Sequence, residues 1–402
     1  MSIINRIKSK IHYYCDLCLT AFAKVCSVFT NNDNTWMVCE KLNEARDNGF
    51  WFYRYLKLNH PECKVYYIIE KDSPDYSKIS QYGEEYMIRP YSLKHRILFL
   101  SCGYCICSQP PLDYFDSYSL IKKIRNKKQI TVFLQHGIIK DNLFHVLDAS
   151  YAGIDVFITS AKREKDSVMS WLGYSDKQCA LTGLCRFDNL SQSDNGKSHI
   201  ILVMPTFRHW LLPEDTNMVP TSDERKRFCS DTFCKEYKSL LYSPETLSLL
   251  KEFNYKIVFY PHYCAQPFLD CFSNGEENDR IILGSREKYD VQRLLIESDI
   301  LITDYSSVFF DFAYMKKPEI FFQFDEKKYR EGHYEEGYFL YRRDAFGPVY
   351  DSYKGLIDYL RHLLENNSSM EPIYKQKVDD FFEYTDNGNC ERTYSYIINY
   401  RK

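Results

Sequence analysis

The chain has 402 residues, enough for two domains that each bury a core of their own. Hydrophobic residues make up 45% of the sequence and charged residues 27%, a balance that excludes a disordered chain and a bundle of membrane spans. The formal net charge of −3 argues against a general nucleic-acid binder, since such proteins carry an excess of positive charge to neutralise phosphates.

The first thirty residues predict an amphipathic helix. Apolar residues recur at helical spacing, at Ile4, Ile7, Ile11, Tyr14, Cys18, Phe22 and Val25. Asp16 and Lys24 interrupt the apolar run, so it is too broken for a spanning helix, which needs about 20 mainly apolar residues. Two roles stay open for this helix: packing against the body of the protein, or lying in the headgroup region of an anionic membrane with its basic residues on the wet side.

Fifteen cysteines are scattered through strand-like and helix-like stretches, which favours reduced thiols in a cytoplasmic protein over a disulfide framework. The tightest cluster, "SCGYCIC" at residues 101–107, contains one CxxC pair, and no second pair follows at a zinc-like distance. We therefore expect buried strand cysteines and no metal site.

Short β-branched and aromatic runs alternate with helix-like stretches from residue 65 onward, which predicts parallel sheets with crossover helices. The expected strands of the first half are 65–70, 104–108, 131–137, 155–160 and 179–183. Those of the second half are 199–205, 256–262, 280–284, 299–304 and 319–324. The sequence therefore predicts an α/β protein with two sheets, each in a Rossmann-like domain.

The polar stretch 191–198 has the composition of a linker and marks the expected boundary between the two domains. The expected parts of the chain are a helix at 1–30, a Rossmann-like acceptor domain at 31–192, a Rossmann-like nucleotide-donor domain at 193–385 and a C-terminal helix at 386–402, which would cross back to the first domain. Residues 210–244 hold charges and prolines with few periodic apolar positions. We expect them to form a long loop near the junction, of the kind that covers a site.

The stretch "ILITDYSSVFFDFAYMKKPEIFF", residues 300–322, reads as a buried strand, two serines, a helix and a second strand. In an open parallel sheet, the carboxyl ends of the strands face a ligand crevice into which the next helix points its N-terminus. Ser306 and Ser307 would offer hydroxyls beside free backbone amides, which suits a phosphate, although serine is also an ordinary helix cap. Asp311 could reach a ribose hydroxyl from the next turn, or it could be a solvated helix residue.

Three other expected strand ends carry unusual polar groups. One ends in His136, with Lys140 close behind it, and another ends in His262. The third is followed by Thr206 and Arg208. A single strand-end histidine is more often structural, but the coincidence predicts one shared site for an anionic ligand. A neutral histidine can accept a proton, and fixed positive charge stabilises a phosphoryl group during its transfer.

These motifs together resemble the CDP-glycerol glycerophosphotransferases, the teichoic-acid primases and polymerases of bacterial cell envelopes. The resemblance extends over most of residues 40–395. It rests on motifs that occur in the family's order: "QHGIIKDN", "GLCRFDNL", "MPTFR", "YPH", "TDYSSVFFDFAYMKKP", "FGP" and "DNGNCER". It implies the GT-B arrangement, in which two Rossmann-like domains face a central cleft.

The resemblance also implies roles for single residues. It makes His136 the base that deprotonates the acceptor hydroxyl, and it makes His262 a second catalytic residue that binds or neutralises the donor pyrophosphate. Ser306 and Ser307 match the positions that hold donor phosphate. The other residues of the expected site are Thr206 and Arg208 at the donor phosphates, and Asp304, Asp311, Lys140 and Arg186 in supporting or nucleotide-binding roles.

The reaction implied is transfer of glycerol phosphate, or a related alditol phosphate, from a CDP-activated donor to a hydroxyl of a teichoic-acid or capsule-like polymer, which can be lipid-linked. CMP would leave. No cofactor is expected to be required, although a Mg²⁺ ion could sit on the pyrophosphate. The expected location is the cytoplasm, at the inner face of the cell membrane if the first helix binds lipid.

Two other functions stay open at this stage. The first is a sugar-nucleotide-dependent GT-B glycosyltransferase of surface polysaccharide synthesis, which would share the fold and move a different group. The second is a nucleotide-binding envelope-assembly protein without catalytic activity. Nucleotide would raise the melting temperature of this second protein, but no acceptor would yield a product.

Overall fold

The computed structural model describes residues 3–110, 118–191, 196–212, 219–276, 278–333 and 335–401. The chain folds into two compact units. The first unit comprises Met1–Ile138, Leu143–Asn189 and Asp386–Lys402, and the second comprises Ile139–Asn142 and Leu190–Thr385. The chain thus passes into the second unit slightly before residue 192, and its C-terminal residues return to the first unit.

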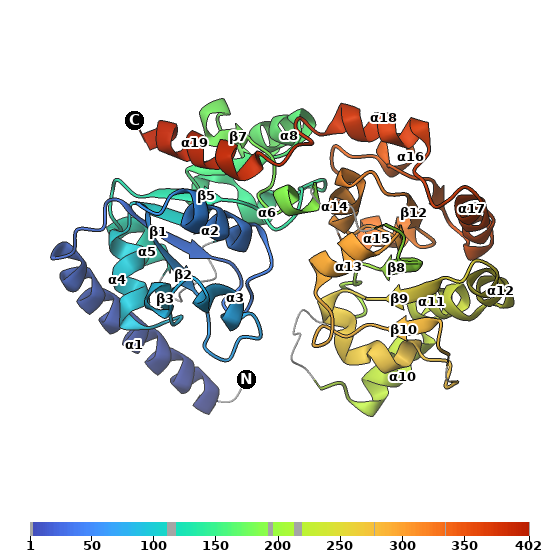
Figure 1. The fold of residues 1–402 in the computed structure, drawn as a ribbon. Coiled ribbons are helices and arrows are strands. Elements are labelled where there is room, and N and C mark those ends of the chain that lie inside the picture. Colours follow the sequence, from blue (N-terminus) through green and yellow to red (C-terminus); the bar gives the residue numbers. More distant parts are fainter. Residues whose placement is uncertain are drawn as a thin grey trace. The chain divides into compact units, whose positions relative to one another are not determined.

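The first unit contains, within the described residues, a seven-stranded parallel sheet in the order β3-β2-β1-β4-β5-β6-β7 (Figure 1). Its strands are β1 Thr35–Cys39, β2 Lys64–Ile68, β3 Met87–Ile88, β4 Tyr104–Cys107, β5 Ile130–Phe133, β6 Val156–Thr159 and β7 Cys179–Leu181. Its helices are α1 Ile3–Val28, α2 Asn48–Asn59, α3 Tyr76–Ser80, α4 Leu93–Ser101, α5 Tyr118–Ile124, α6 Phe144–Leu147, α7 Ala149–Ala152, α8 Lys162–Leu172, α9 Phe187–Leu190 and α19 Asn389–Arg401. Strands β1, β4, β5 and β6 are buried along their whole length, as in parallel sheets with both faces covered, so they read as continuous apolar runs.

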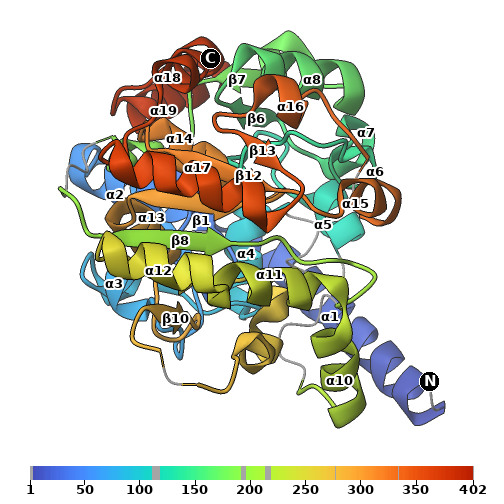
Figure 2. The same ribbon diagram turned by 90° about the vertical axis from the view of Figure 1, so that its right-hand side faces the viewer.

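The second unit contains, within its described residues, a six-stranded parallel sheet in the order β10-β9-β8-β11-β12-β13. Its strands are β8 Ile200–Met204, β9 Lys256–Phe259, β10 Ile281–Leu283, β11 Ile300–Thr303, β12 Glu319–Phe322 and β13 Val349–Tyr350. Its helices are α10 Ser222–Ser230, α11 Thr232–Tyr242, α12 Pro244–Glu252, α13 Val291–Glu297, α14 Val308–Tyr314, α15 Glu326–Gly332, α16 Tyr341–Asp344, α17 Tyr353–Glu365 and α18 Pro372–Phe381, with a 3₁₀ helix at Tyr263–Phe272. Helices α11, α12 and α17 lie side by side over one face of this sheet (Figure 2).

The predicted α/β class with two parallel sheets is confirmed, and every expected strand is present. Strands β1, β3 and β13 were missed. Strand β1, "TWMVC", is the middle of its sheet, and the Trp36 ring stacks on that of Tyr104 in β4 with 4.0 Å between centroids. A five-residue run says little by itself, because its burial comes from pairing with β2 and β4, which lie far along the chain.

The expectation of a long covering loop at 210–244 is wrong for the part from residue 219 onward that the structure describes. This part forms α10 and α11, and α12 follows directly. Phe228, Phe233 and Tyr237 are buried in the core of the second unit. The helical spacing from Phe233 to Tyr237 and Leu241 was present in the sequence, but the surrounding charges obscured it.

Helix α1 lies beside α4 in the first unit (Figure 1), and the predicted helix is confirmed. From Tyr13 onward, where the side chains of α1 are described, the buried ones are Asp16, Thr20, Ala23 and Ser27. Arg96 of α4 donates to the Thr20 hydroxyl at 3.0 Å and pairs with the Asp16 carboxylate. The basic side chains at residues 6–10 lie outside the described part. None of the described helices has both the length and the apolar character that a membrane span requires.

The cysteines of the "SCGYCIC" cluster are buried in and before β4, as expected. Burial raises the pKa of Cys102 to about 12, so this thiol stays protonated at neutral pH. Within the described ranges, no three side chains of the metal-binding types come together as a cation site would need.

Candidate active site

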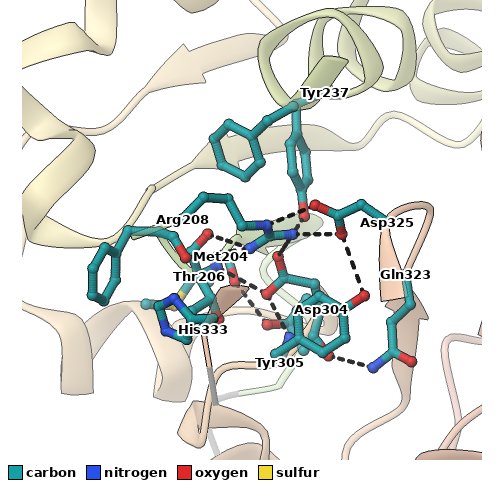
Figure 3. Close-up of polar contacts among 12 residues, drawn as sticks. Met204, Thr206, Arg208, Tyr237, Asp304, Tyr305, Gln323, Asp325 and His333 are labelled. Carbon is teal, nitrogen blue, oxygen red and sulfur yellow. Dashed lines mark hydrogen bonds and ion pairs between the residues drawn. The ribbon is translucent and has the colours of Figure 1, made fainter. Parts of the chain in front are cut away.

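A cluster of polar residues in the second unit lies at the carboxyl ends of β8 and β11, where the strand order of the sheet changes direction (Figure 3). Its members are Thr206, Arg208, Tyr237, Asp304 and Asp325. Asp304 follows β11 and is fully buried. One of its oxygens accepts backbone N–H bonds from Thr206 at 2.8 Å and Tyr305 at 2.5 Å. Its other oxygen accepts the Tyr237 hydroxyl at 3.2 Å. Asp304 therefore ties the two strand ends together, which fits the supporting role expected for it.

Arg208 is fully buried and committed to protein partners, so it does not fit the expected role as a phosphate ligand. Its guanidinium donates to both oxygens of Asp325 at 2.8 and 3.0 Å, and it pairs with Asp304 at 2.9 Å. Another N–H donates to the Thr206 carbonyl at 2.7 Å. Burial disfavours the charge, but Asp304 and Asp325 outweigh burial and raise the pKa of Arg208. The sequence could not show these carboxylate partners, because neither lies near Arg208 in the chain.

Ser306 and Ser307 stand where β11 turns into α14, and both are half-buried. The Val308 N–H donates to the Ser306 hydroxyl at 3.4 Å, so this serine caps the turn. Asp311 is only 3% exposed. An aspartate buried in this way does not fit the expected contact with a ribose hydroxyl.

A histidine cluster, formed by His209, His262 and His333, surrounds the ring of Phe207. The His262 ring stacks on Phe207 with 4.5 Å between centroids, and its Nδ1 accepts the Cys264 N–H at 3.4 Å. His209 and His333 lie 4.7 and 4.8 Å from the same phenyl ring and 3.9 Å from each other. The sequence singled out His262 only. The position of His209 directly after "MPTFR" was the one feature of the sequence that could have identified it as a site residue, and His333 follows no such motif.

Lys140 follows β5 of the first sheet in the chain, yet it belongs to the second unit. Its ammonium group pairs with Asp141, whose carboxylate also pairs with Arg330 of α15 at 2.8 Å. A Cβ on Gly337 would lie 2.0 Å from the Lys140 carbonyl, so only glycine fits there. Burial lowers the pKa of Lys140, and Arg330 acts in the same direction while Asp141 and Asp304 oppose it.

The loop that carries His136 in the first unit is held through its backbone. Gln135 adopts a left-handed conformation with φ of 63°, which is uncommon for a residue other than glycine. The Asn48 side chain donates to the Gln135 carbonyl at 2.8 Å, and Arg186 donates to the His136 carbonyl at 3.0 Å. Arg186 also pairs with Asp47 at 2.7 Å. Arg186 therefore acts as a positioning residue, which fits the supporting role expected for it.

The imidazole of His136 is exposed, so a hydroxyl could approach it. The protein packed around it limits its hydration and lowers the pKa of His136, and Arg186 and Lys41 act in the same direction while Asp47 opposes them. The ring is therefore neutral at physiological pH. A neutral ring with solvent access meets the requirements for a general base.

Glu40 is a buried carboxyl at the end of β1 that the sequence did not single out. It accepts backbone N–H bonds from Arg46 and Asp47 at 3.0 Å and from Phe50 at 2.6 Å, which anchors the start of α2. Burial and the nearby Asp47 raise the pKa of Glu40 to about 8. A Cβ on Gly49 would meet Glu40 at 2.7 Å, so the two residues require each other.

The expected residues thus separate by unit. His136 and Arg186 lie in the first unit, and the residues of the second unit are Lys140, Thr206, Arg208, His262, Asp304, Ser306, Ser307 and Asp311. The second unit holds the ion pairs of Lys140 and Arg208 and the serine turn, and the first unit holds the exposed His136 ring and the Arg186–Asp47 pair.

Comparisons with known proteins agree with these motifs. Residues 20–399 match the family model described as CDP-Glycerol:Poly(glycerophosphate) glycerophosphotransferase. The minor teichoic acid biosynthesis protein GgaB of Bacillus subtilis (strain 168) is 33% identical over 379 residues, which cover 92% of this chain and 40% of GgaB. The teichoic acid glycerol-phosphate transferase of Staphylococcus aureus (strain NCTC 8325 / PS 47) is 30% identical over 190 residues, 46% of this chain and 45% of the transferase.

A solved structure of the wall teichoic acid polymerase TagF superimposes with a TM-score of 0.67 at 17% identity, over 99% of this chain and 98% of that one. At this identity the likeness shows the shared fold. The matches to the two curated relatives span less than half of the length of each. Because the family model matches most of the chain, the protein belongs to the CDP-glycerol:poly(glycerophosphate) glycerophosphotransferase family.

Proposed function

We propose that this protein transfers glycerol phosphate from CDP-glycerol to a hydroxyl of a cell-envelope polymer, of the teichoic-acid or capsule-like kind, and releases CMP. The observation that carries the proposal is the match of residues 20–399 to a family named for this reaction. The exposed, neutral imidazole of His136 supports it from the first unit, and the strand-end cluster of the second unit supplies the groups for a nucleotide donor.

In the proposed step, the acceptor hydroxyl oxygen attacks the β-phosphorus of CDP-glycerol. A new oxygen–phosphorus bond forms as the bond between this phosphorus and the bridging oxygen breaks, and CMP leaves with the electron pair. The hydroxyl proton passes to His136. His262 and the turn at Ser306 and Ser307 bind the donor phosphates, with Asp304 and Arg208 holding the turn. A Mg²⁺ ion could bind the donor pyrophosphate, and no step of the proposal depends on it.

Release of CMP distinguishes this function from its rivals. Purified protein incubated with CDP-glycerol and a polyglycerol-phosphate primer should release CMP and extend the primer, as measured by chromatography and mass spectrometry. A sugar-nucleotide glycosyltransferase would instead consume a UDP-sugar and release UDP. A nucleotide-binding assembly protein would bind CDP-glycerol without turnover, and that result would contradict the proposal.

The outward face of α1 supports a second part of the proposal, attachment to a membrane. Several large apolar side chains of α1 and the residue after it are exposed: Tyr14 (64%), Leu19 (46%), Phe22 (57%), Val25 (60%), Val28 (71%) and Phe29 (85%). The polar residues Asp16, Thr20 and Ser27 face inward instead. Because its apolar side chains face outward and its polar ones inward, burying the outer face of α1 at the boundary between lipid headgroups and acyl chains would be favourable in free energy.

A basic groove next to the C-terminal end of α1 points to the same partner. It has a volume of about 590 Å³, and among its lining residues are Lys24, Lys123, Arg125, Lys127 and Lys128. The groove is also lined by the acidic residue Asp33, which pairs with Lys128 at 3.6 Å. Each basic residue near an anionic membrane surface contributes about 1 kcal/mol to binding. The proposal therefore places the protein at the inner face of the cell membrane, on anionic lipid.

Replacing Phe22, Val25 and Phe29 by serine should abolish sedimentation with phosphatidylglycerol vesicles. Each replacement removes roughly 1.5 kcal/mol or more of the free energy gained by burying the side chain in lipid. We therefore expect the partition coefficient between vesicles and water to fall by more than about 100-fold. CMP release with a soluble primer should stay unchanged. Serine at Leu58, an exposed residue of α2, serves as the matched control. Unchanged sedimentation of the triple variant would exclude α1 as the attachment site.

A further inference from the structure

The histidine cluster, formed by His209, His262 and His333, reaches the surface beside the polar strand ends of the second unit. All three rings are half-buried, and they share the nearly buried Phe207 as a base. The backbone N–H of His262 donates to the Pro205 carbonyl at 3.1 Å, so the cluster directly adjoins Thr206 and the Asp304 turn. The backbone N–H of His209 donates to His333 Nδ1 at 3.3 Å, which fixes the His333 ring against the backbone that carries His209.

The fixed charges around this cluster balance one another. The cations are Lys140, Arg208 and Arg330, and the carboxylates are Asp141, Asp304 and Asp325. The rings of Tyr263 and Tyr329 also lie against it, and the exposed Lys328 of α15 lies over Trp210. Three positive and three negative groups sum to zero. The buried ion pairs therefore leave no surplus positive charge for an anionic ligand.

The histidines are the groups that can supply this charge. Burial lowers the pKa of His333 to about 2, and His209, Arg208, Lys140 and His262 act in the same direction. The ring is therefore neutral at physiological pH when no anion is present. The two negative charges of a bound diphosphate, within a few ångströms of the cluster, would favour an imidazolium there.

We propose that His209 joins His262 in binding the pyrophosphate of a nucleotide donor, with His333 as the residue that positions them, and that the cluster takes up a proton as the donor binds. The identity of the donor as CDP-glycerol rests on the proposed function, whereas the preference for a diphosphate diester rests on the cluster. By linkage, a site that gains a proton on binding holds its ligand more tightly as the pH falls.

Calorimetry of donor binding tests the proposal. CDP-glycerol is titrated into the protein in two buffers of different ionisation enthalpy, and the difference in heat counts the protons exchanged. Each phosphorus of CDP-glycerol carries one ester bond, the shared anhydride bond and a single strongly acidic hydroxyl, so the ligand itself does not titrate between pH 6.5 and 8.5. We expect uptake of about 0.5 to 1 proton, and a dissociation constant that rises about threefold to tenfold per pH unit over this range. Wild-type binding without proton uptake would overturn the proposal.

Variants assign the proton to the cluster. His209→Gln and His333→Gln should each weaken CDP-glycerol binding about tenfold and reduce the proton count, with melting temperatures close to that of the wild type. His362→Gln, at an exposed histidine of α17, serves as the control and should change neither. If one variant fails to fold, the other carries the test. Wild-type affinity and proton count in a folded variant would exclude its histidine from the site.

A second ligand separates failure of this inference from failure of the proposed function. UDP-glucose carries the same diphosphate diester and a different nucleoside and leaving group. If UDP-glucose binds with proton uptake that the two variants lose, and CDP-glycerol does not bind, the donor is misassigned and the role of the cluster stands. If both ligands bind without proton exchange, the role of the cluster is wrong whichever donor the enzyme uses.

Discussion

Replacing His136 by alanine is expected to lower the rate of CMP release by about 10²–10⁴-fold, the range that a general base contributes. The dissociation constant for CDP-glycerol should stay within about twofold of the wild type, because the donor groups lie in the second unit. The backbone of this loop is held by Asn48 and Arg186 through carbonyl groups, which alanine retains. Turnover assays and donor titration measure the two quantities separately.

The pH dependence of turnover in the wild type is a second test of His136. The surroundings lower the pKa of His136 below the ordinary value of about 6.5, so the neutral form predominates above that pH. The rate attributable to the base should therefore be constant above neutrality and fall as the pH drops through the lowered pKa. His362→Ala is a suitable control at an exposed histidine. Normal turnover in His136→Ala would show that another group takes the proton.

Replacing Arg208 by methionine is expected to destabilise the second unit by about 3–5 kcal/mol, the cost of breaking a buried ion pair from one side. The fully buried Asp304 and the largely buried Asp325 would lose their shared counter-charge. A loss of this size lowers the melting temperature of a unit of about 200 residues by roughly 6–20 °C. Calorimetry, or urea unfolding followed by tryptophan fluorescence, measures the change.

An exposed pair gives the contrast for this variant. Arg361 pairs with Glu252 at 3.0 Å, and both side chains are more than 40% exposed. Arg361→Met should cost less than about 1 kcal/mol, because water screens exposed charges. Adding Asp304→Asn and Asp325→Asn to Arg208→Met should recover part of the lost stability. A melting temperature unchanged in Arg208→Met would mean that the buried pairs contribute nothing to the stability of the second unit.

The sequence was a good guide wherever the informative pattern is local. Serine hydroxyls after an apolar strand, as at Ser306, and a histidine at a strand end, as at His136, follow from the periodicity of the residues around them. The two sheets were predictable for the same reason, since each strand is a short apolar run that repeats at the spacing of βαβ units. Strand β1 was missed although it forms such a unit with α2 and β2, because its burial depends on pairing with β2 and β4, which lie far along the chain.

The sequence was a poor guide to which charges are paired. Arg208 looked like a phosphate ligand because it follows a strand end, and Asp325 and Asp304 lie about a hundred residues away in the chain. Asp311 looked accessible because it sits one turn into a helix, and packing buries it. The orientation of α1 also could not be predicted from the sequence. Apolar spacing predicted the helix, but the contacts of Arg96 with Asp16 and Thr20 show that the side carrying these polar residues is the packed one.

The order of residues along the chain determined the α/β class, the two sheets and the histidine and serine motifs at the strand ends, because backbone geometry and strand periodicity act between near neighbours. Tertiary structure decided which cations remain available to a ligand, which histidines share one environment, and which side of α1 faces outward. Those properties depend on burial and on Coulomb interactions between groups far apart in sequence, and distance in space sets both of them.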